Sequence, residues 1–230
     1  ESMYQKVLIA VDGSDEAINA TEETVKLGLT KGAEVLIMGA LDISGITFQG
    51  LNSLNEEEMN RIKEACRQRN LAGVEKALRA LGVSNITPLI VENTPAAAIS
   101  DTAEKENADV VVVGRRGIGA IRSFFMGSVS LKVLELCECP VLVVPKDYIA
   151  RGPLKTLVIP TDFSAAANYG LLHAAKLAKF TGARIVLVHD CQVESDTDNR
   201  AAEASAQLEA IAAPLREDGV VVKCVVYTAG

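Results

Sequence analysis

The chain lacks tryptophan and is poor in aromatic residues, which make up 4% of its 230 residues. Apolar residues nevertheless account for 49% of the chain, enough to bury a substantial core. Such a core must be built from valine, isoleucine, leucine and alanine, the residues that fill buried parallel sheets. The length leaves room for one large domain or two modest ones.

Long apolar runs are also missing: none approaches the roughly 20 residues that a membrane-spanning helix needs. The N-terminal stretch ESMYQKVLIAVDGS leads directly into an expected strand and a polar turn, so we expect no signal peptide. The five cysteines are scattered and odd in number, which does not indicate a disulfide framework. Together these features predict a cytoplasmic protein with no membrane partner.

Excess positive charge is absent, since the formal net charge is −7 and the sequence pI is about 5.0. This balance excludes a nucleic-acid binder that relies on overall positive charge, and we expect no nucleic-acid partner. Cys137 and Cys139 form C-x-C, which is neither the C-x-x-C of a redox site nor that of a zinc site. We therefore expect these two cysteines to be structural.

The sequence repeats itself at an offset of 150 positions. KVLIAVDGS, which begins at Lys6, aligns with TLVIPTDFS, which begins at Thr156, so that Asp12 matches Asp162. KGAEVLIM and TGARIVLV then align without a gap. The repeat predicts two homologous domains, residues 1–147 and 155–230, joined by a polar linker at 148–154.

The first copy alternates short β-branched runs with helical patterns, which predicts an open, doubly wound parallel α/β sheet of the Rossmann-like kind. The expected strands are Val7–Val11, Val35–Ala40, Ile86–Val91, Asp109–Val113 and Pro140–Val144.

Helix signals lie between these runs. Ser14 is expected to cap the first helix and Gly32 to end it. Residues 56–81 predict one long charged helix, with Ile62, Cys66, Leu78 and Leu81 facing inward. Thr94 is expected to cap a helix that opens with Pro95, and a last helix is expected at about Ser128–Cys137.

The second copy supplies a strand, a helix, a strand, a helix at about Asn199–Glu217 and a strand at Val220–Tyr227. It lacks counterparts of the fourth strand, the glycine-rich stretch and the last helix and strand. Because a sheet of this kind would keep an unpaired edge, we expect the natural protein to continue beyond Gly230.

The stretch GRRGIGAIRSFFMGS, from Gly114 to Ser128, follows the fourth expected strand and opens the last helix. Ligands of open α/β sheets bind beyond the carboxyl ends of the strands. Glycines let the backbone approach a ligand, and a helix N-terminus offers free N–H groups to a phosphate. The stretch therefore predicts a phosphate cradle, and the alternative is a flexible turn with helix-capping residues.

The usual nucleotide signatures are missing. There is no GxxxxGK[ST], and Arg122 stands where a dinucleotide fingerprint has its third glycine. Neither the S-G-G-x-D-S loop of ATP pyrophosphatases nor the H-x-G-H of nucleotidylyltransferases occurs.

The spacing G-x2-G-x9-G-S at Gly114, Gly117, Gly127 and Ser128 resembles the ATP-binding motif of the universal stress protein family. VDGS, PTDFS and CPVLVVP resemble the first-strand and last-strand signatures of that family. The resemblance covers the whole chain as a tandem pair with a truncated second member.

The resemblance implies that the first domain binds an adenine nucleotide, ATP or AMP, with Mg²⁺ on the phosphates as an option. Asp12 would meet the adenosine part, beside Ala10 and Val11, and Ala40 would offer backbone to the base. The ribose and phosphates would be held by Gly114, Gly117, Gly127, Ser128 and Val129, with the cation Arg115 nearby. The resemblance also implies a domain–domain pseudo-dimer and a homodimer.

Two classes of function stay open: a stress-response nucleotide sensor or regulator, and a slow ATPase or phosphotransferase in the same pocket. Catalysis needs a base and usually a metal site beside the γ-phosphate. No histidine lies in the first domain, and Ser128 and Ser130 offer only hydroxyls. Binding is therefore favoured over catalysis.

Single residues also have simpler interpretations. Asp12 and Asp162 could each cap the following helix. His189, Asp190 and Cys191 could bind a metal, but three adjacent residues do not easily converge on one ion.

Overall fold

The computed structural model describes residues 2–43, 55–115, 126–149, 152–191 and 197–228. The chain divides into two compact units, residues 1–151 and 152–230.

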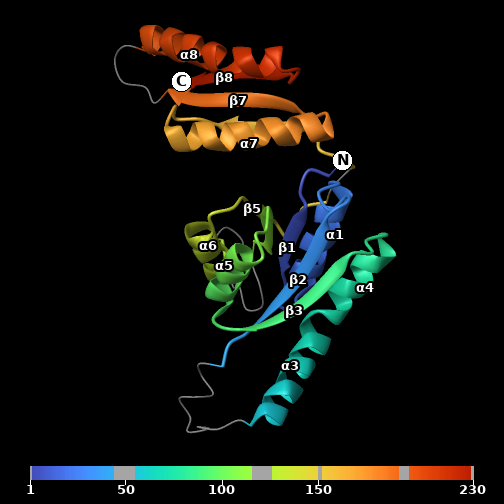
Figure 1. The fold of residues 1–230 in the computed structure, drawn as a ribbon. Helices are drawn as coiled ribbons and strands as arrows, with labels where there is room; N and C mark the ends of the chain where they lie inside the picture. The colour runs from blue at the N-terminus through green and yellow to red at the C-terminus, as the bar shows by residue number, and fades with distance from the viewer. Residues whose placement is uncertain (1, 44–54, 116–125, 150–151, 192–196, 229–230) are drawn as a thin grey trace. The chain divides into compact units, whose positions relative to one another are not determined.

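The first unit is built on a five-stranded parallel sheet with the strand order β3-β2-β1-β4-β5 (Figure 1). Its strands are β1 (Lys6–Ala10), β2 (Glu34–Leu41), β3 (Ile86–Glu92), β4 (Val110–Gly114) and β5 (Val141–Val144). Each lies within one or two residues of its predicted position at either end.

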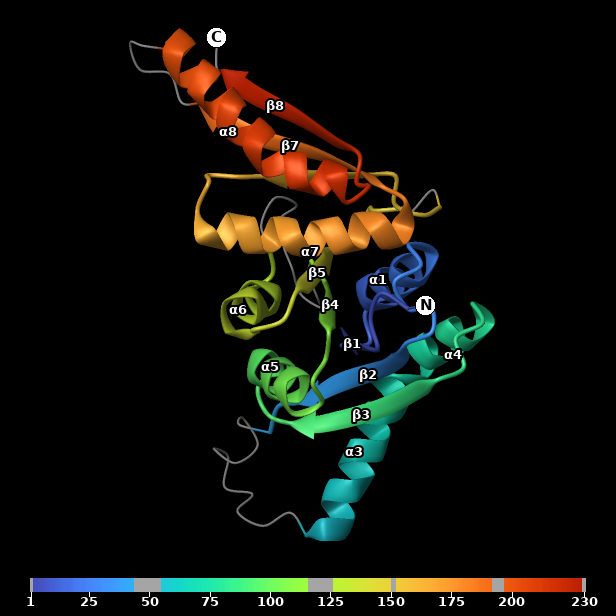
Figure 2. The same ribbon diagram turned by 45° about the horizontal axis from the view of Figure 1, so that its top comes forward.

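Helices cover both faces of this sheet. Leu8, Leu36 and Val111 point to the face that packs against α5 (Pro95–Lys105) and α6 (Ser128–Leu136). The opposite face lies under α1 (Asp15–Lys26), α3 (Glu56–Asn70) and α4 (Ala72–Ala80), as Figures 1 and 2 show. The predicted doubly wound parallel sheet is thus confirmed for this unit.

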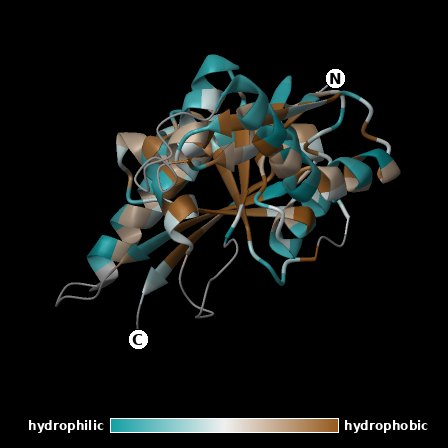
Figure 3. Cartoon of the chain, turned by 90° about the horizontal axis from the view of Figure 1, so that it is seen from below, coloured by the Kyte–Doolittle hydropathy of each residue, from teal (hydrophilic) through white to brown (hydrophobic). Residues whose placement is uncertain are grey.

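The centre of strand β1 is fully buried on both faces of the sheet. The side chains of Val7, Leu8 and Ile9 are all 0% exposed, although successive residues point to opposite faces. Burial of each such side chain is worth about 1.5–3 kcal/mol. In Figure 3, which colours the chain by hydropathy, the central strands are brown and the helices carry teal residues among paler ones.

Helix α1 begins as predicted and ends earlier than predicted. The Ser14 hydroxyl accepts a hydrogen bond from the Ala17 amide, which makes Ser14 the N-cap. The helix stops at Lys26 rather than near Gly32, because Gly28 adopts φ +79° and turns the chain. At α5, Thr94 occupies the predicted N-cap position, but its side chain makes no cap hydrogen bond.

The single helix predicted over residues 56–81 is wrong. The chain forms α3 and α4, which meet at Leu71, and Leu71 is 0% exposed with φ −102° and ψ −30°. The bend lets α4 pack on α1 at Gly73, where an added Cβ would lie 3.5 Å from Ile18 Cδ1. Cys66 and Leu78 are buried as predicted, whereas Leu81 is 40% exposed.

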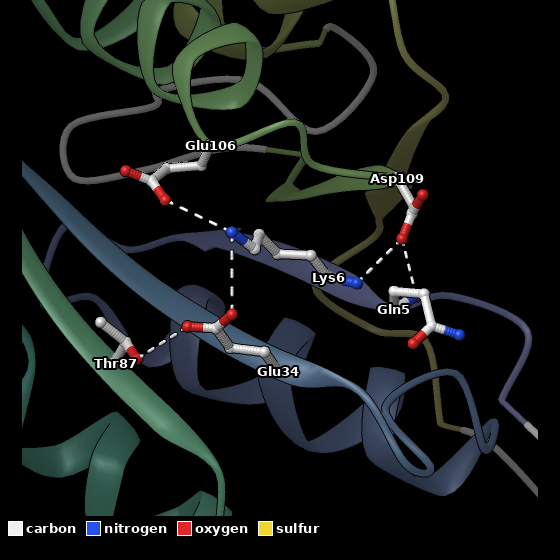
Figure 4. A network of polar contacts seen from close by, with 6 residues as sticks. All are labelled: Gln5, Lys6, Glu34, Thr87, Glu106 and Asp109. Carbon is white, nitrogen blue, oxygen red and sulfur yellow. Dashed lines mark hydrogen bonds and ion pairs between the residues drawn. The ribbon is translucent and has the colours of Figure 1, made fainter.

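Polar contacts join residues at the amino-terminal ends of β1, β2, β3 and β4 (Figure 4). Asp109, which precedes β4, accepts hydrogen bonds from the Gln5 amide at 2.6 Å and the Lys6 amide at 2.8 Å. The Lys6 ammonium pairs with Glu34 at 3.7 Å and with Glu106 at 3.4 Å. This network fixes where β1 enters the sheet.

The second unit contains a three-stranded parallel sheet with the order β6-β7-β8. Its elements are β6 (Thr156–Pro160), α7 (Ala165–Thr181), β7 (Arg184–Cys191), α8 (Thr197–Glu217) and β8 (Val222–Thr228). Helices α7 and α8 pack on the same face of the sheet. β6 and β7 repeat β1 and β2 at the offset of 150, but α7 is longer than α1 because Ala178 stands where α1 has the turn-forming Gly28.

In the part of the chain that the structure describes, no helix is both long enough and apolar enough to cross a membrane.

Burial of Tyr4 predicts that the first unit loses stability at alkaline pH. Its ring is 5% exposed, and burial, helped by the charge of Asp109, raises the pKa of Tyr4 to about 12. The unfolded chain releases this proton near pH 10, so the free energy of unfolding should fall between about pH 10 and 12, by at most about 1.4 kcal/mol per pH unit. Urea unfolding followed by circular dichroism across this range measures the slope.

Tyr4→Phe should flatten that slope. Tyr169→Phe is the matched control, since Tyr169 is 76% exposed and its removal should leave the slope as it was. Equal slopes in all three proteins would contradict the assignment to Tyr4.

Candidate functional site

The strand order of the first unit creates an opening at the carboxyl ends of β1 and β4. These two strands are neighbours, but α1 leaves β1 for one face of the sheet and α6 follows β4 onto the other. The connections that follow β1 and β4 therefore separate beyond the carboxyl ends of these strands. Open α/β sheets bind ligands at such a position.

A pocket of about 560 Å³ occupies this opening. Its volume lies within the roughly 300–1,000 Å³ typical of small-molecule sites. The wall combines apolar side chains with a few polar groups. It is lined by Ala10, Val11, Asp12, Ala17, Met38, Ala40, Arg69, Asn70, Pro95, Ile99, Val113, Gly114, Gly127, Ser128, Val129 and Ser130.

The turn between β1 and α1 presents Asp12 to the pocket. Asp12 Oδ1 accepts hydrogen bonds from the Ser14 amide at 3.0 Å and the Ser14 hydroxyl at 2.6 Å. Asp12 is therefore not the helix cap itself, since Ser14 has that role. The carboxylate is half-buried and supports the turn while facing the pocket.

The start of α6 forms the wall after β4. Gly127 is the N-cap and has no side chain that could bond the first helical amides. The amides of Ser128, Val129 and Ser130 therefore have no partner within the helix, and the first helical bond is donated by the Leu131 amide to the Gly127 carbonyl at 3.0 Å. This end of the pocket offers N–H donors and partial positive charge, which suit an anion.

Ser130 holds this wall against the sheet. Its side chain is buried, and its hydroxyl donates to the Gly114 carbonyl at 2.8 Å. The Gly127 amide donates to the Arg115 carbonyl at 2.8 Å, and the Arg115 amide donates to the Val144 carbonyl at 2.8 Å. These bonds tie both ends of the glycine-rich stretch to β4 and β5, and they engage the Ser130 hydroxyl.

The structure brings most of the predicted site residues together. Those that line the pocket are Ala10, Val11, Asp12, Ala40, Gly114, Gly127, Ser128 and Val129. Arg115 is not among the residues that line it, and its backbone bonds Val144 and Gly127. Gly117 and the cations Arg116 and Arg122 lie outside the described residues.

Sequence reasoning missed the contribution of α3. Arg69 and Asn70 reach the pocket from the last turn of this helix, just before the bend at Leu71. Their place depends on close approach to two glycines: a Cβ on Gly13 would lie 2.9 Å from Asn70 Oδ1, and one on Gly39 would lie 3.7 Å from Asn70 Cβ. The sequence gives no signal for this contribution, because the helical pattern continues past Asn70 without a break.

The second unit has a different arrangement at the matching place. Phe163 and His189 stand where the first unit has Gly13 and Gly39, and their rings lie 4.3 Å apart between centroids. His189 Nδ1 lies 2.8 Å from the Thr161 carbonyl, which makes this nitrogen the donor. Asp162 repeats the turn of Asp12, because its Oδ1 accepts a bond from the Ser164 amide at 2.9 Å.

Among the described residues, no three histidine, cysteine or acidic side chains gather closely enough to hold a metal ion, including His189, Asp190 and Cys191. Burial raises the pKa of the Cys137 thiol to about 11 and also raises the pKa of Cys139. Both thiols therefore stay protonated at neutral pH, which agrees with a structural role.

A second hollow, of about 340 Å³, lies on α3 and α4 away from the sheet. Charged side chains line it and pair with one another, as Arg79 does with Glu75 at 2.8 Å. It has the character of a solvated helix surface rather than of a ligand site.

Gly13 should be far less tolerant of a side chain than Gly28, although both have φ near +80°. Gly28→Ala adds only backbone strain, about 1–2 kcal/mol, because nothing lies within 4 Å of the new Cβ. Gly13→Ala adds the same strain and pushes its Cβ against Asn70 Oδ1 and the Arg69 carbonyl. It should therefore cost at least about 1 kcal/mol more.

Urea unfolding of the two variants and of the unaltered protein measures both costs. Equal losses for Gly13→Ala and Gly28→Ala would show that α3 does not rest on Gly13.

Comparison with known proteins agrees with this architecture. A universal stress protein of Methanocaldococcus jannaschii is 33% identical over 147 residues, which cover 64% of this chain and 85% of the relative. One of Thermus aquaticus is 34% identical over 142 residues, covering 62% of this chain and 99% of the relative. A solved universal stress protein of Archaeoglobus fulgidus has the same fold, with a TM-score of 0.72 at 18% identity, over 100% of this chain and 78% of that one.

The family model of the universal stress proteins matches residues 3–145 and, over a shorter second part, residues 153–228. These two matches follow the internal repeat. The chain belongs to the universal stress protein family, with two family segments in tandem.

Proposed function

We propose that the first unit binds an adenine nucleotide, ATP or AMP, and that the chain acts as a nucleotide-dependent sensor or regulator in a stress response. The observation that carries this proposal is the start of α6, whose uncapped amides line the pocket beyond β4. A phosphate at this position would complete hydrogen bonds that the helix cannot make itself.

The rest of the pocket supports a nucleoside beside that phosphate. Met38, Ile99 and Val113 form apolar walls against which a base can pack, and Asp12 supplies a carboxylate that accepts bonds from hydroxyl or amino groups. Asp12 follows β1, whereas the amides belong to the helix after β4. The arrangement suits an adenosine toward β1 and β2 and phosphates toward α6.

Magnesium would enter with the nucleotide rather than bind by itself. Asp12 is the single carboxylate among the residues that line the pocket. Mg²⁺ on nucleotides is commonly held by one or two carboxylates together with phosphates and water. Asp12 and the phosphates fit such a weak site, while a metal cage made by the protein alone has too few ligands here.

Binding is favoured over catalysis by the groups that face the phosphate end. The Ser130 hydroxyl is engaged with the Gly114 carbonyl, and both histidines of the chain lie in the second unit. Ser128 is exposed at the first position of α6, with no described histidine or carboxylate bonded to it as a base. The alternative is a slow ATPase or phosphotransferase, which would convert ATP during incubation with Mg²⁺.

Ser128→Pro tests the phosphate site without removing the helix. Proline suits the first position of a helix, and Gly127 already has the ψ of 150° that a residue before proline adopts. The change removes one amide donor and the hydroxyl, whereas Ser128→Ala removes the hydroxyl alone. By calorimetric titration, Ser128→Pro should bind ATP and AMP about tenfold more weakly than Ser128→Ala does.

Adenosine provides the internal control, because it lacks phosphate and should bind both variants equally. Equal ATP affinities of the two variants would contradict the phosphate site at α6. Chromatography of the nucleotide after incubation with Mg²⁺ tests the alternative: steady conversion of ATP that Ser128→Pro abolishes would identify an enzyme.

We also propose that two copies of the first unit associate through β5 and α6. β5 is the last strand in the order of this sheet, and such an edge offers unpaired backbone groups. Leu131, Leu134 and Leu136 of α6 are 52%, 42% and 41% exposed, which is unusual for leucine.

Light scattering during size-exclusion chromatography tests this association. Leu134→Glu should shift the chain from dimer to monomer, whereas Leu172→Glu on α7, where Leu172 is 58% exposed, should not. A monomeric unaltered protein would contradict the proposed homodimer.

A further inference from the structure

Asn70 is a buried polar side chain in the pocket wall, and its hydrogen bonds among the described residues are made within its own helix. It is 5% exposed, lines the pocket, and stands on the last turn of α3. A buried amide normally has hydrogen-bond partners for its oxygen and nitrogen, because an unpaired one loses its bonds to water without compensation.

The partners of Asn70 leave part of its amide unused. Its Oδ1 accepts one bond, from Arg69 Nε at 3.0 Å, and its Nδ2 has only Cys66 Sγ at 3.5 Å among the described residues. A thiol sulfur is a weak acceptor. An amide oxygen accepts two bonds and an amide nitrogen donates two, so one acceptor position and one N–H of Asn70 have no bond among the described residues.

Asn70 lies on the β1–β2 side of the pocket. Its Oδ1 is 2.9 Å from the position of a Cβ on Gly13, the residue after Asp12, and its Cβ is 3.7 Å from that of Gly39, the residue before Ala40. The amides of α6 follow β4 on the other side of β1. Asn70 is therefore placed at the nucleoside part of the pocket and not at the phosphates.

We propose that Asn70 selects the base of the bound nucleotide by pairing with the N6 and N7 edge of adenine; this inference rests on the proposed function. An asparagine amide matches this edge because it accepts a bond from N6–H and donates one to N7. Guanine presents two acceptors, O6 and N7, on the same edge, so Oδ1 would face an oxygen that cannot donate.

Arg69 is the positioning residue for this contact. Its Nε–H bond to Oδ1 holds one orientation of the Asn70 amide, with the nitrogen on the side of Cys66. The bend at Leu71 and the two glycines then bring the amide to the sheet. In the second unit, Phe163 and His189 occupy the matching glycine positions.

The test compares ATP with 7-deaza-ATP, which replaces N7 by C–H, and with GTP, by calorimetric titration of the full chain. The unaltered protein should bind ATP about tenfold more tightly than 7-deaza-ATP, the effect of one hydrogen bond, and should also prefer ATP to GTP. Asn70→Leu keeps the branched shape of the side chain without the amide, and it should bind ATP and 7-deaza-ATP equally.

Gln68→Leu is the matched control. It removes an exposed amide from the same helix that bonds only Glu64 and does not line this pocket, so the tenfold preference should remain. If Asn70→Leu fails to fold, as judged by circular dichroism, Asn70→Ala, which removes the amide without adding volume, takes its place in the same comparison.

Equal affinity of the unaltered protein for ATP and 7-deaza-ATP would overturn this inference and leave the proposed function standing. A tenfold preference that persists in Asn70→Leu would do the same. Failure of the unaltered protein to bind ATP at all would overturn the proposed function, and this inference with it.

Discussion

Burial of β1 on both of its faces is the constraint on which the rest of the first unit depends. Its three central side chains are fully buried, and its backbone pairs with β2 on one side and β4 on the other. Asp109 fixes the start of the strand by accepting bonds from two successive amides. Because the start and both faces are fixed, the position where the strand ends is fixed too, and Asp12 is delivered to the pocket.

The same constraint explains why the opening lies beside β1. A strand between two parallel neighbours needs helices on both faces, and the connections after β1 and β4 leave in opposite directions. The gap between them cannot be filled by the sheet. Ser130 and the backbone bonds of Arg115 then hold the start of α6 beside this gap, so the first residues of the helix, whose amides have no partner within it, line the pocket.

Much of this arrangement could be predicted from the sequence because it depends on local patterns. Runs such as VVVV in β4 predict buried parallel strands, and Ser14 and Gly127 mark the beginnings of α1 and α6. Gly114 was predicted in this way, because it opens the glycine-rich stretch after the run of valines, whereas Asp12 and Ala40 were implied by the family resemblance.

What the sequence did not predict depends on contacts between distant segments. The bend at Leu71 arises where α4 packs on α1, and helical periodicity continues through it without a proline. Arg69 and Asn70 were therefore missed, since their place follows from that bend. The early end of α1 was missed for a different reason, because both Gly28 and Gly32 adopt a positive φ and either could have ended the helix.

The two units share the positions of their first two strands but differ in the residues at the carboxyl ends of those strands. β6 and β7 repeat β1 and β2 residue for residue at the offset of 150, and Asp162 forms the same turn as Asp12. The difference lies in two positions without side chains, Gly13 and Gly39, where the second unit has Phe163 and His189. A Cβ at Gly13 already meets Asn70 at 2.9 Å, so an aromatic ring at that position is incompatible with the place that Asn70 takes in the first unit.

A helix can bring polar groups to the end of these strands only where the strands leave room for it. The structural difference between the matching strand ends of the two units is therefore set by absent atoms as much as by the polar groups that line the pocket.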